Sequence, residues 1–341
     1  MRNTSVSILF LALILSTDVP AAEIAVSEPL EEVVVSGEFP GPGMWKVSRA
    51  DDASGRVLWI IGAQTSLPKR LKWKSREVEA VVESAQEILL DSTVSMVPDE
   101  KIGIFRGLTL VPAMLKARKN PEEATLEQML PPELYARWQV QKKRFLGREQ
   151  GVEEWRPIFA ADKLRREAVD DLGLRESGMV WEVVQKIAEK HKTKVTTPSL
   201  KYTFKRSEVR DKIKEFSRES LADVECFSTT LDYTEALSRT ETEAARARAW
   251  ATGDIAALEA LPQLPNPLLP CAMAVLSSQV ARNMIPTDIR EQLFTLWLDA
   301  AQQSLRTNQT TFAIVPLRKL LGADGYLAAL REKGCTIDSP R

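Results

Sequence analysis

The sequence is poor in the residues that build most metal sites and acid-base sites. It has one histidine, His191, among 341 residues, and imidazole is both the commonest protein ligand of zinc and the usual proton carrier near neutral pH. The three cysteines form no Cys-x-x-Cys pair, which argues against a thiol redox centre or a cysteine zinc site. We therefore expect neither a metal nor another cofactor. His191 lies between two lysines beyond an apolar helical stripe, which is typical of a solvated helix end.

An excess of one charge sign and long hydrophobic runs are also missing. Lysine and arginine number 46 against 47 acidic residues, so no overall positive field would attract nucleic-acid phosphates. We predict no nucleic-acid partner. The longest apolar stretch after the N-terminus, 268–280, is broken by Pro270 and is too short to span a bilayer. With 44% hydrophobic residues, the chain can bury a sizeable core in one or two domains.

One local cluster of cations departs from this balance. Its simplest interpretation is a solvated loop leading into a helix, and the alternative is a surface for an anionic ligand. The cluster surrounds Trp73 and consists of Lys69, Arg70, Lys72, Lys74 and Arg76.

The N-terminus has the three parts of a secretory signal. Arg2 precedes an apolar run over 6–15, and small residues at Ala21 and Ala22 permit cleavage. We expect a signal peptide over 1–21, a periplasmic mature protein and no transmembrane segment after cleavage. An uncleaved N-terminal anchor is the alternative. Residues 22–43, rich in Pro, Gly and acids, predict a flexible linker.

The odd number of cysteines predicts one disulfide and one free thiol in an exported protein, because an oxidising compartment favours pairing. Cys226 and Cys271 are the expected pair, since both lie in a helix-rich stretch flanked by turn or cap signals. Cys335 lies in a short run that looks like a buried strand. Three reduced, buried cysteines are the alternative.

The start of the expected folded region, 44–341, predicts an α/β unit. Two short apolar runs, 44–47 and 57–61, are separated by a turn-rich segment and indicate a hairpin. A helix should follow Ser75, because apolar residues recur there at helical spacing. The run 87–91 is short and nearly all apolar, as in a buried parallel strand.

The middle of the chain predicts helices, and the C-terminus returns to α/β. Apolar stripes at helical spacing run through 180–188, 209–216 and 289–300, with an interruption at 193–204 rich in β-branched residues. At the C-terminus we expect a strand over 311–315, a helix over 324–333 and a last strand over 335–337. The predicted fold class is thus α/β, with a central mixed sheet built from N- and C-terminal strands and a large helical insertion at about 105–300.

Two terminal segments carry a family resemblance. Residues 312–335 run Phe-Ala-Ile-Val-Pro-Leu-Arg-Lys-Leu-Leu-Gly-Ala-Asp-Gly-Tyr-Leu-Ala-Ala-Leu-Arg-Glu-Lys-Gly-Cys. They resemble the closing segment of the TraB/GumN family, where an apolar strand, Gly-x-x-His, Leu-x-Gly-x-x-Gly and a helix follow one another. Residues 58–65, Leu-Trp-Ile-Ile-Gly-Ala-Gln-Thr, resemble that family's first strand and first Gly-x-x-His. Asp91 falls where the family ends a strand in Glu, and Arg282 is similar to an arginine in a helix before the second motif.

The resemblance implies a metal site, and the sequence departs from that site at every ligand. In the family, which is related to the Tiki proteins, two histidines and a glutamate are thought to hold a metal, and some members resemble metal-dependent peptidases. Here the first motif begins at Gly62 and places Thr65 at the histidine position. The second places Lys319 there, preceded by Arg318, and the glutamate position holds Asp91. Threonine is a poor zinc ligand and a protonated lysine has no lone pair to give.

We therefore predict a divergent member with a degenerate metal site. The expected function is a non-catalytic binding or scaffolding protein of the periplasm, whose partner is an unknown protein or an anionic small molecule. In this view Asp91 pairs with Arg318 or Lys319 across the old cleft. The alternative is a metal-independent hydrolase, similar to a peptidase, with Thr65 or Lys319 as nucleophile or base. That alternative lacks a histidine base and a Gly-x-Ser-x-Gly turn.

Overall fold

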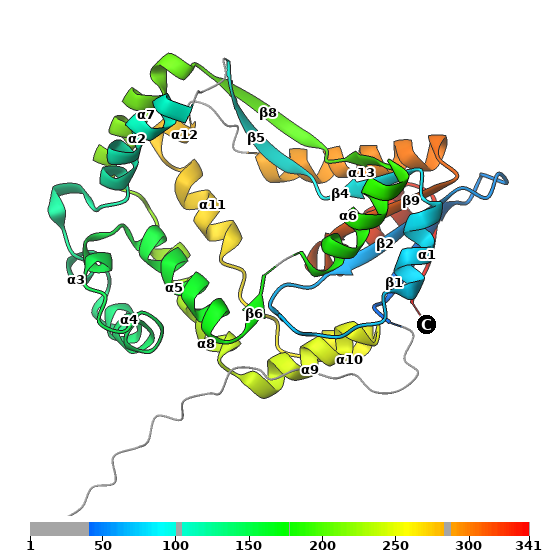
Figure 1. Cartoon of the computed structure of the whole chain (residues 1–341), viewed down its shortest axis with the longest axis horizontal. Helices are drawn as coiled ribbons and strands as arrows, with labels where there is room; N and C mark the ends of the chain where they lie inside the picture. The colour runs from blue at the N-terminus through cyan, green and yellow to red at the C-terminus, as the bar shows by residue number, and fades with distance from the viewer. Residues whose placement is uncertain (1–40, 100–103, 177, 283–287, 341) are drawn as a thin grey trace, which may run out of the picture.

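A six-stranded mixed sheet is the centre of the molecule (Figure 1). The computed structural model describes residues 41–99, 104–176, 178–282 and 288–340. Across the sheet the order is β10 (Cys335–Asp338), β1 (Met44–Arg49), β2 (Val57–Ala63), β9 (Thr310–Pro316), β4 (Glu87–Leu90) and β7 (Lys194–Thr196). Strand β1 runs antiparallel to both of its neighbours, β10 and β2, whereas β2, β9, β4 and β7 run parallel to one another.

Helices make up most of the rest of the described chain. Three short 3₁₀ helices join them: η1 (Pro121–Glu123), η2 (Gly151–Glu154) and η3 (Arg206–Glu208). The α-helices are α1 (Arg76–Ser84), α2 (Ile104–Ala117), α3 (Leu126–Met129), α4 (Pro132–Phe145), α5 (Pro157–Asp171), α6 (Met179–His191), α7 (Val209–Arg218), α8 (Val224–Leu237), α9 (Thr240–Ala251), α10 (Ile255–Ala260), α11 (Leu268–Leu276), α12 (Gln279–Arg282), α13 (Ile289–Thr307), α14 (Leu317–Leu320) and α15 (Tyr326–Glu332). None of them is long and apolar enough to cross a bilayer.

The sheet confirms the predicted α/β fold class. The expected hairpin forms, with Val47 opposite Leu58 in β1 and β2, and both side chains are fully buried. Helix α1 then connects β2 to the parallel strand β4. Strand β9, from the other end of the chain, lies between them and pairs with both, so the sheet is completed only when the two chain ends meet.

The sheet core also recruits helices from the middle of the chain. Helices α1 and α6 pack together, and α13 packs on β2, β4 and β9. Trp297 of α13 and Trp250 of α9 belong to the same apolar cluster as the strands. Parts of the expected helical insertion at 105–300 therefore contribute to the sheet's core. His191 is the exposed last residue of α6, as predicted.

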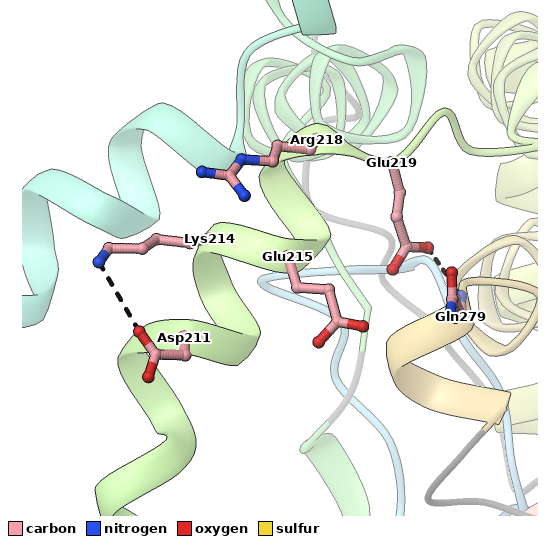
Figure 2. A pocket seen from close by; sticks show the side chains of 6 residues that line it. All are labelled: Asp211, Lys214, Glu215, Arg218, Glu219 and Gln279. Atoms are coloured by element: carbon pink, nitrogen blue, oxygen red, sulfur yellow. Dashed lines mark hydrogen bonds and ion pairs between the residues drawn. The ribbon is translucent and has the colours of Figure 1, made fainter.

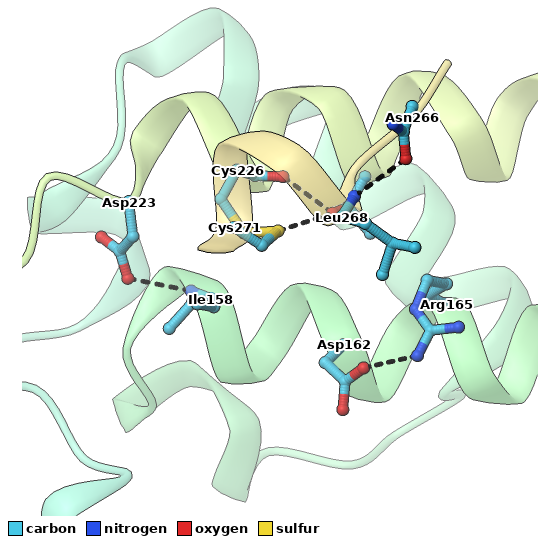
Figure 3. Close-up of a disulfide and its surroundings, with 9 residues drawn as sticks. Ile158, Asp162, Arg165, Asp223, Cys226, Asn266, Leu268 and Cys271 are labelled. Atoms are coloured by element: carbon cyan, nitrogen blue, oxygen red, sulfur yellow. Dashed lines mark hydrogen bonds and ion pairs between the residues drawn. A yellow bond between two sulfur atoms is a disulfide. The ribbon is translucent and has the colours of Figure 1, made fainter. Parts of the chain in front are cut away.

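The expected disulfide joins two helices of the helical half (Figure 3). Cys226 of α8 is bonded to Cys271 of α11, at a sequence separation of 45, and Cys335 is a buried free thiol in β10. Closing a loop of that length contributes roughly 4 kcal/mol on the chain-entropy model. Next to the bond, the buried Asp223 carboxylate accepts the backbone N–H of Ile158 at 2.9 Å and ties α8 to α5.

A parallel two-stranded ribbon links the sheet to the helical half. Strands β5 (Thr93–Pro98) and β8 (Ser199–Phe204) pair over six residues and run from the sheet toward α2 and α7 (Figure 1). The interruption expected at 193–204 corresponds to β7 and β8, whereas no strand was expected at the position of β5. A smaller pair joins β3 (Leu67–Pro68) to β6 (Leu174–Arg175).

The expected signal peptide over 1–21, and 22–40 of the expected linker, lie outside the described residues. Of the linker's last three residues, Gly41 and Pro42 are buried. A Cβ atom on Gly41 would approach the carbonyl oxygen of Lys74 to 2.6 Å. The packed chain therefore includes the end of that segment.

Candidate functional site

The carboxyl ends of three parallel strands meet at one edge of the sheet. Gly62 of β2 lies opposite Val315 of β9, and Leu90 of β4 lies opposite Ile314. The loops that follow these strands therefore emerge side by side, and such an edge is where parallel sheets usually build a ligand site. Thr65 and Asp91 stand on the loops after β2 and β4, and Lys319 stands in α14, which follows β9 directly.

An ion pair joins two of the three positions. Lys319 Nζ lies 2.6 Å from Asp91 Oδ2, and the side chains are 35% and 22% exposed. The Tyr326 hydroxyl donates to the other carboxylate oxygen, Oδ1, at 3.0 Å. Both oxygens of Asp91 are thus engaged, one by a charge and one by a neutral donor. The predicted contact between Asp91 and Lys319 is present.

Tyr326 is held in place by aromatic packing. Its ring stacks on Trp297 at 4.1 Å and on Phe294 at 4.8 Å between centroids, and the residue is 1% exposed. Burial raises the pKa of its hydroxyl, and the nearby negative charge of Asp91 raises the pKa further. The hydroxyl therefore stays protonated and remains a hydrogen-bond donor to Asp91.

Two glycines of the Leu-x-Gly-x-x-Gly segment allow Tyr326 to return to the strand end. Gly322 has φ +89°, a left-handed conformation that favours glycine. A Cβ atom on Gly325 would lie 2.4 Å from the carbonyl oxygen of Leu320. Any side chain there would push α15 away from the edge.

Gly62 has a similar role on the other side of the site. A Cβ atom at this position would come within 2.4 Å of Leu317 Cδ1, so glycine permits α14 to pack tightly against β2. Its carbonyl oxygen accepts the indole N–H of Trp250 at 2.8 Å. This close approach positions Arg318 and Lys319, which follow Leu317 directly.

Arg318 contributes a second positive charge beside the ion pair. The residue is exposed, and no hydrogen bond or ion pair engages its guanidinium within the described ranges. Desolvation of the guanidinium by surrounding protein lowers its pKa, against the opposing influence of Asp91 and Tyr233. Arg318 therefore lies within electrostatic reach of both residues while its donors remain open.

A second polar cluster lies beside the first and was missed by sequence reasoning. Ser66, 1% exposed, shares a short hydrogen bond with the Tyr233 hydroxyl, and Ser66 has φ +63°. Tyr233 also approaches Glu176 at 3.5 Å, which pairs with Arg165. Burial raises the pKa of Tyr233. The only sequence signal was that Ser66 follows Thr65.

The other predicted positions are placed as follows. Thr65 is half-buried in the loop after β2, where its carbonyl oxygen accepts from Gln64 Nε2 at 3.1 Å. Arg282 is the exposed last residue of α12, which packs on α7 and α11. The structure therefore brings Asp91, Arg318 and Lys319 together near the end of β2, and does not place Arg282 with them.

The donor set at this edge does not fit a divalent metal. Among the described residues, Asp91 is the one carboxylate that pairs with Lys319. Both of its oxygens already accept a hydrogen bond. Two cations stand beside it and would repel a third. Across the described parts of the chain, no group of three or more His, Cys, Asp or Glu residues is arranged to hold a metal.

Comparison with known protein families gives a match over most of the chain. The model of the TraB/PrgY/gumN family matches residues 43–339, which is nearly all of the chain after its first 42 residues. No curated protein and no solved structure matches.

Proposed function

We propose that this chain, which belongs to the TraB/PrgY/gumN family, is an exported, non-catalytic protein that binds an anionic partner at the edge formed by Asp91, Arg318 and Lys319. The anion is a small molecule or an acidic group of a protein. The observation that carries this proposal is the ion pair between Lys319 and Asp91, next to Arg318, whose guanidinium has no partner among the residues that the structure describes.

The balance of charge at the edge favours an anion. Asp91 offsets the charge of Lys319, and the guanidinium of Arg318 remains as a surplus positive charge. A guanidinium presents several N–H donors in one plane, which match the two oxygens of a carboxylate or phosphate. The hydroxyl of Tyr326 is already used on Asp91, so Arg318 is the group best placed to receive a ligand.

The hydrolase alternative has less support. The side-chain nitrogen of Lys319 is engaged with the carboxylate of Asp91, so it is not free to act as a base or nucleophile on a substrate. The Ser66 hydroxyl is bonded to Tyr233, but Ser66 is 1% exposed, so a substrate could not reach it without movement of the loop.

Two features support export to an oxidising compartment such as the periplasm. The N-terminal segment 1–21 has the pattern of a signal peptide. The bond between Cys226 and Cys271 is of the kind that persists outside the reducing cytosol. Detection of the mature N-terminus in a periplasmic fraction would test this part of the proposal, and retention of the protein in the cytosol would contradict it.

The binding proposal is tested by the thermal stability of the full mature protein in inorganic phosphate. Phosphate should raise the melting temperature relative to chloride at equal ionic strength, because a ligand that binds only the folded state stabilises it. Arg318→Gln should lose this increase. Arg331→Gln, an exposed arginine on α15, is the matched control and should keep it.

Equal phosphate responses in the wild type and Arg318→Gln would contradict the binding proposal. Elemental analysis of protein purified without chelator supplies a second test. The donor set predicts far less than one zinc, manganese or cobalt ion per chain, and a stoichiometric metal would contradict the degenerate site.

A further inference from the structure

A second charged groove lies far from the strand ends, on the other side of the molecule in Figure 1. It is a cavity of about 940 Å³ between the C-terminal half of α2, the 3₁₀ helix η1 and helix α7. This volume lies within the range of small-molecule sites. Five cations and two carboxylates line it: Lys116, Lys119, Arg210, Lys214, Arg218, Glu122 and Glu123.

The walls of this groove are fixed by a buried arginine. Arg156 is 1% exposed and donates four hydrogen bonds to backbone carbonyl oxygens at the ends of the two helices. Two of the acceptors, Ala117 and Lys119, are at the end of α2, at 3.0 and 3.1 Å. The other two, Phe216 and Glu219, are at the end of α7, at 2.9 and 2.7 Å. The groove is therefore preformed.

Three of its cations form a stripe along α7. Arg210, Lys214 and Arg218 are spaced by four residues and so share one face of the helix. Like charges at this spacing destabilise a helix. Lys214 approaches Asp211 only at 3.7 Å, and neither arginine has a hydrogen bond or ion pair to any residue that the structure describes. Helix formation alone does not account for this stripe.

By contrast, the carboxylate of Glu219, which follows α7, has its hydrogen bonds satisfied within the fold (Figure 2). It accepts the backbone N–H groups of Gln279 at 2.7 Å and Val280 at 3.2 Å, at the start of α12. Lys214 and Arg218 extend away from Glu219 in this view. They also line the groove toward α2, where five cations outnumber two carboxylates.

Apolar side chains adjoin these cations. Pro112, Leu115 and Pro121 line the groove. On α2, Pro112 is exposed and Leu115 is 50% exposed. Exposed apolar side chains that border a cluster of lysine and arginine are typical of surfaces that lie against a bilayer.

We propose that this groove binds the anionic head group of a membrane lipid. The phosphate is paired by Arg210, Lys214 and Arg218, and Pro112 and Leu115 of α2 face the acyl region. A lipid of this kind matches both halves of the surface, because its phosphate pairs with the stripe and its hydrocarbon covers Pro112 and Leu115. A free inorganic anion would pair with the stripe of cations alone and would leave the apolar residues uncovered.

The test is co-sedimentation of the full mature protein with vesicles. Vesicles of phosphatidylglycerol and phosphatidylcholine in equal amounts should bind the protein, and vesicles of phosphatidylcholine alone should bind it much more weakly. Arg210→Gln/Arg218→Gln should weaken binding to the anionic vesicles roughly 30-fold, from the usual contribution of a basic residue near such a surface. Lys186→Gln/Lys190→Gln removes the same charge from exposed positions of α6 and should have little effect.

Two further measurements distinguish a membrane lipid from a free anion, and this groove from the sheet edge. Leu115→Ser should weaken binding to vesicles, whereas a site for free anions would not respond to it. Arg318→Gln should bind vesicles normally, which separates this proposal from the one for the sheet edge. Equal binding to both kinds of vesicle, or full binding by the double arginine variant, would overturn the lipid assignment. A dimer that the double arginine variant dissociates would also overturn it, because a second copy would then occupy the groove.

Discussion

Strand β4 carries an acidic residue at each end, and the two carboxylates have different surroundings. Glu87 opens the strand and Asp91 follows its last residue. Each pairs with one lysine and accepts further hydrogen bonds from side chains of other segments. The similarity is chemical, and the difference lies in burial and in the charges that remain unpaired nearby.

At the first end, the protein satisfies Glu87 completely. The residue is 7% exposed and accepts from Lys194 at 2.8 Å, from Asn308 at 2.7 Å and from Thr196. Burial acts to raise the pKa of this carboxyl, but the three donors outweigh burial and lower the pKa. No surplus cation stands beside it among these contacts, so this end serves the sheet's stability.

At the second end of β4, a positive charge next to Asp91 has no partner in the described structure. Asp91 is more exposed than Glu87, and its donors Lys319 and Tyr326 come from the segment after β9. The neighbouring Arg318 has no partner in the described structure and reaches solvent. A carboxylate that only holds the fold needs no second cation, and this surplus positive charge is the reason we propose a binding site at this end.

The largest expected effect follows from removing Glu87. Glu87→Ala leaves a buried cavity and three donors without their acceptor, although Lys194 is 70% exposed and can be solvated. We expect a loss of about 3 kcal/mol in the free energy of unfolding, measured by urea denaturation. A loss below that of Asp91→Ala would break the comparison between the two ends.

Asp91→Ala should have the second largest effect. It removes the acceptor of the buried Tyr326 hydroxyl and leaves Lys319 unpaired, but the site is partly open to water. We expect a loss of about 2 kcal/mol, above the ~1 kcal/mol typical of exposed pairs. Lys333→Ala, at an exposed position next to α15, is the control and should cost well under 1 kcal/mol. A value for Asp91→Ala no larger than this control would show that the contact with Tyr326 contributes nothing.

The sequence predicted the parts of this comparison that local patterns encode. The hairpin and the strands at 87–91 and 311–315 showed short apolar runs, and the helix after Ser75 showed a helical apolar pattern; burial imposes both. The contact of Asp91 with Lys319 could be expected only through the family resemblance, since the two are 228 positions apart.

Contacts that depend on packing between distant segments were not predictable in this way. Nothing in the local sequence indicates that Tyr326 donates to Asp91, or that Ser66 meets Tyr233, 167 positions later. The parallel pairing of β5 with β8 was missed for the same reason, because its two strands are about a hundred residues apart and β5 has little apolar alternation.

A smaller effect is the pH dependence of the stability that Glu87 contributes, and it sharpens the contrast between the two carboxylates. The pKa of Glu87 is lower in the folded state than its ordinary value of about 4.3. Its contribution to stability is therefore fully present above that value and is lost as the pH falls through the folded pKa. The difference in unfolding free energy between the wild type and Glu87→Gln should shrink below about pH 4. A difference that stays constant down to about pH 2 would contradict the assigned pKa direction.

The most direct measurement is the affinity of inorganic phosphate for Asp91→Asn, by calorimetry at low ionic strength. The amide can still accept from Tyr326, but it no longer neutralises Lys319, so affinity should rise about fivefold over the wild type, equivalent to ~1 kcal/mol. Arg318→Gln should bind more weakly than the wild type. We expect these opposite changes in phosphate affinity because both residues belong to one site. Unchanged phosphate affinity in both variants would contradict the claim that this strand end is an anion-binding site.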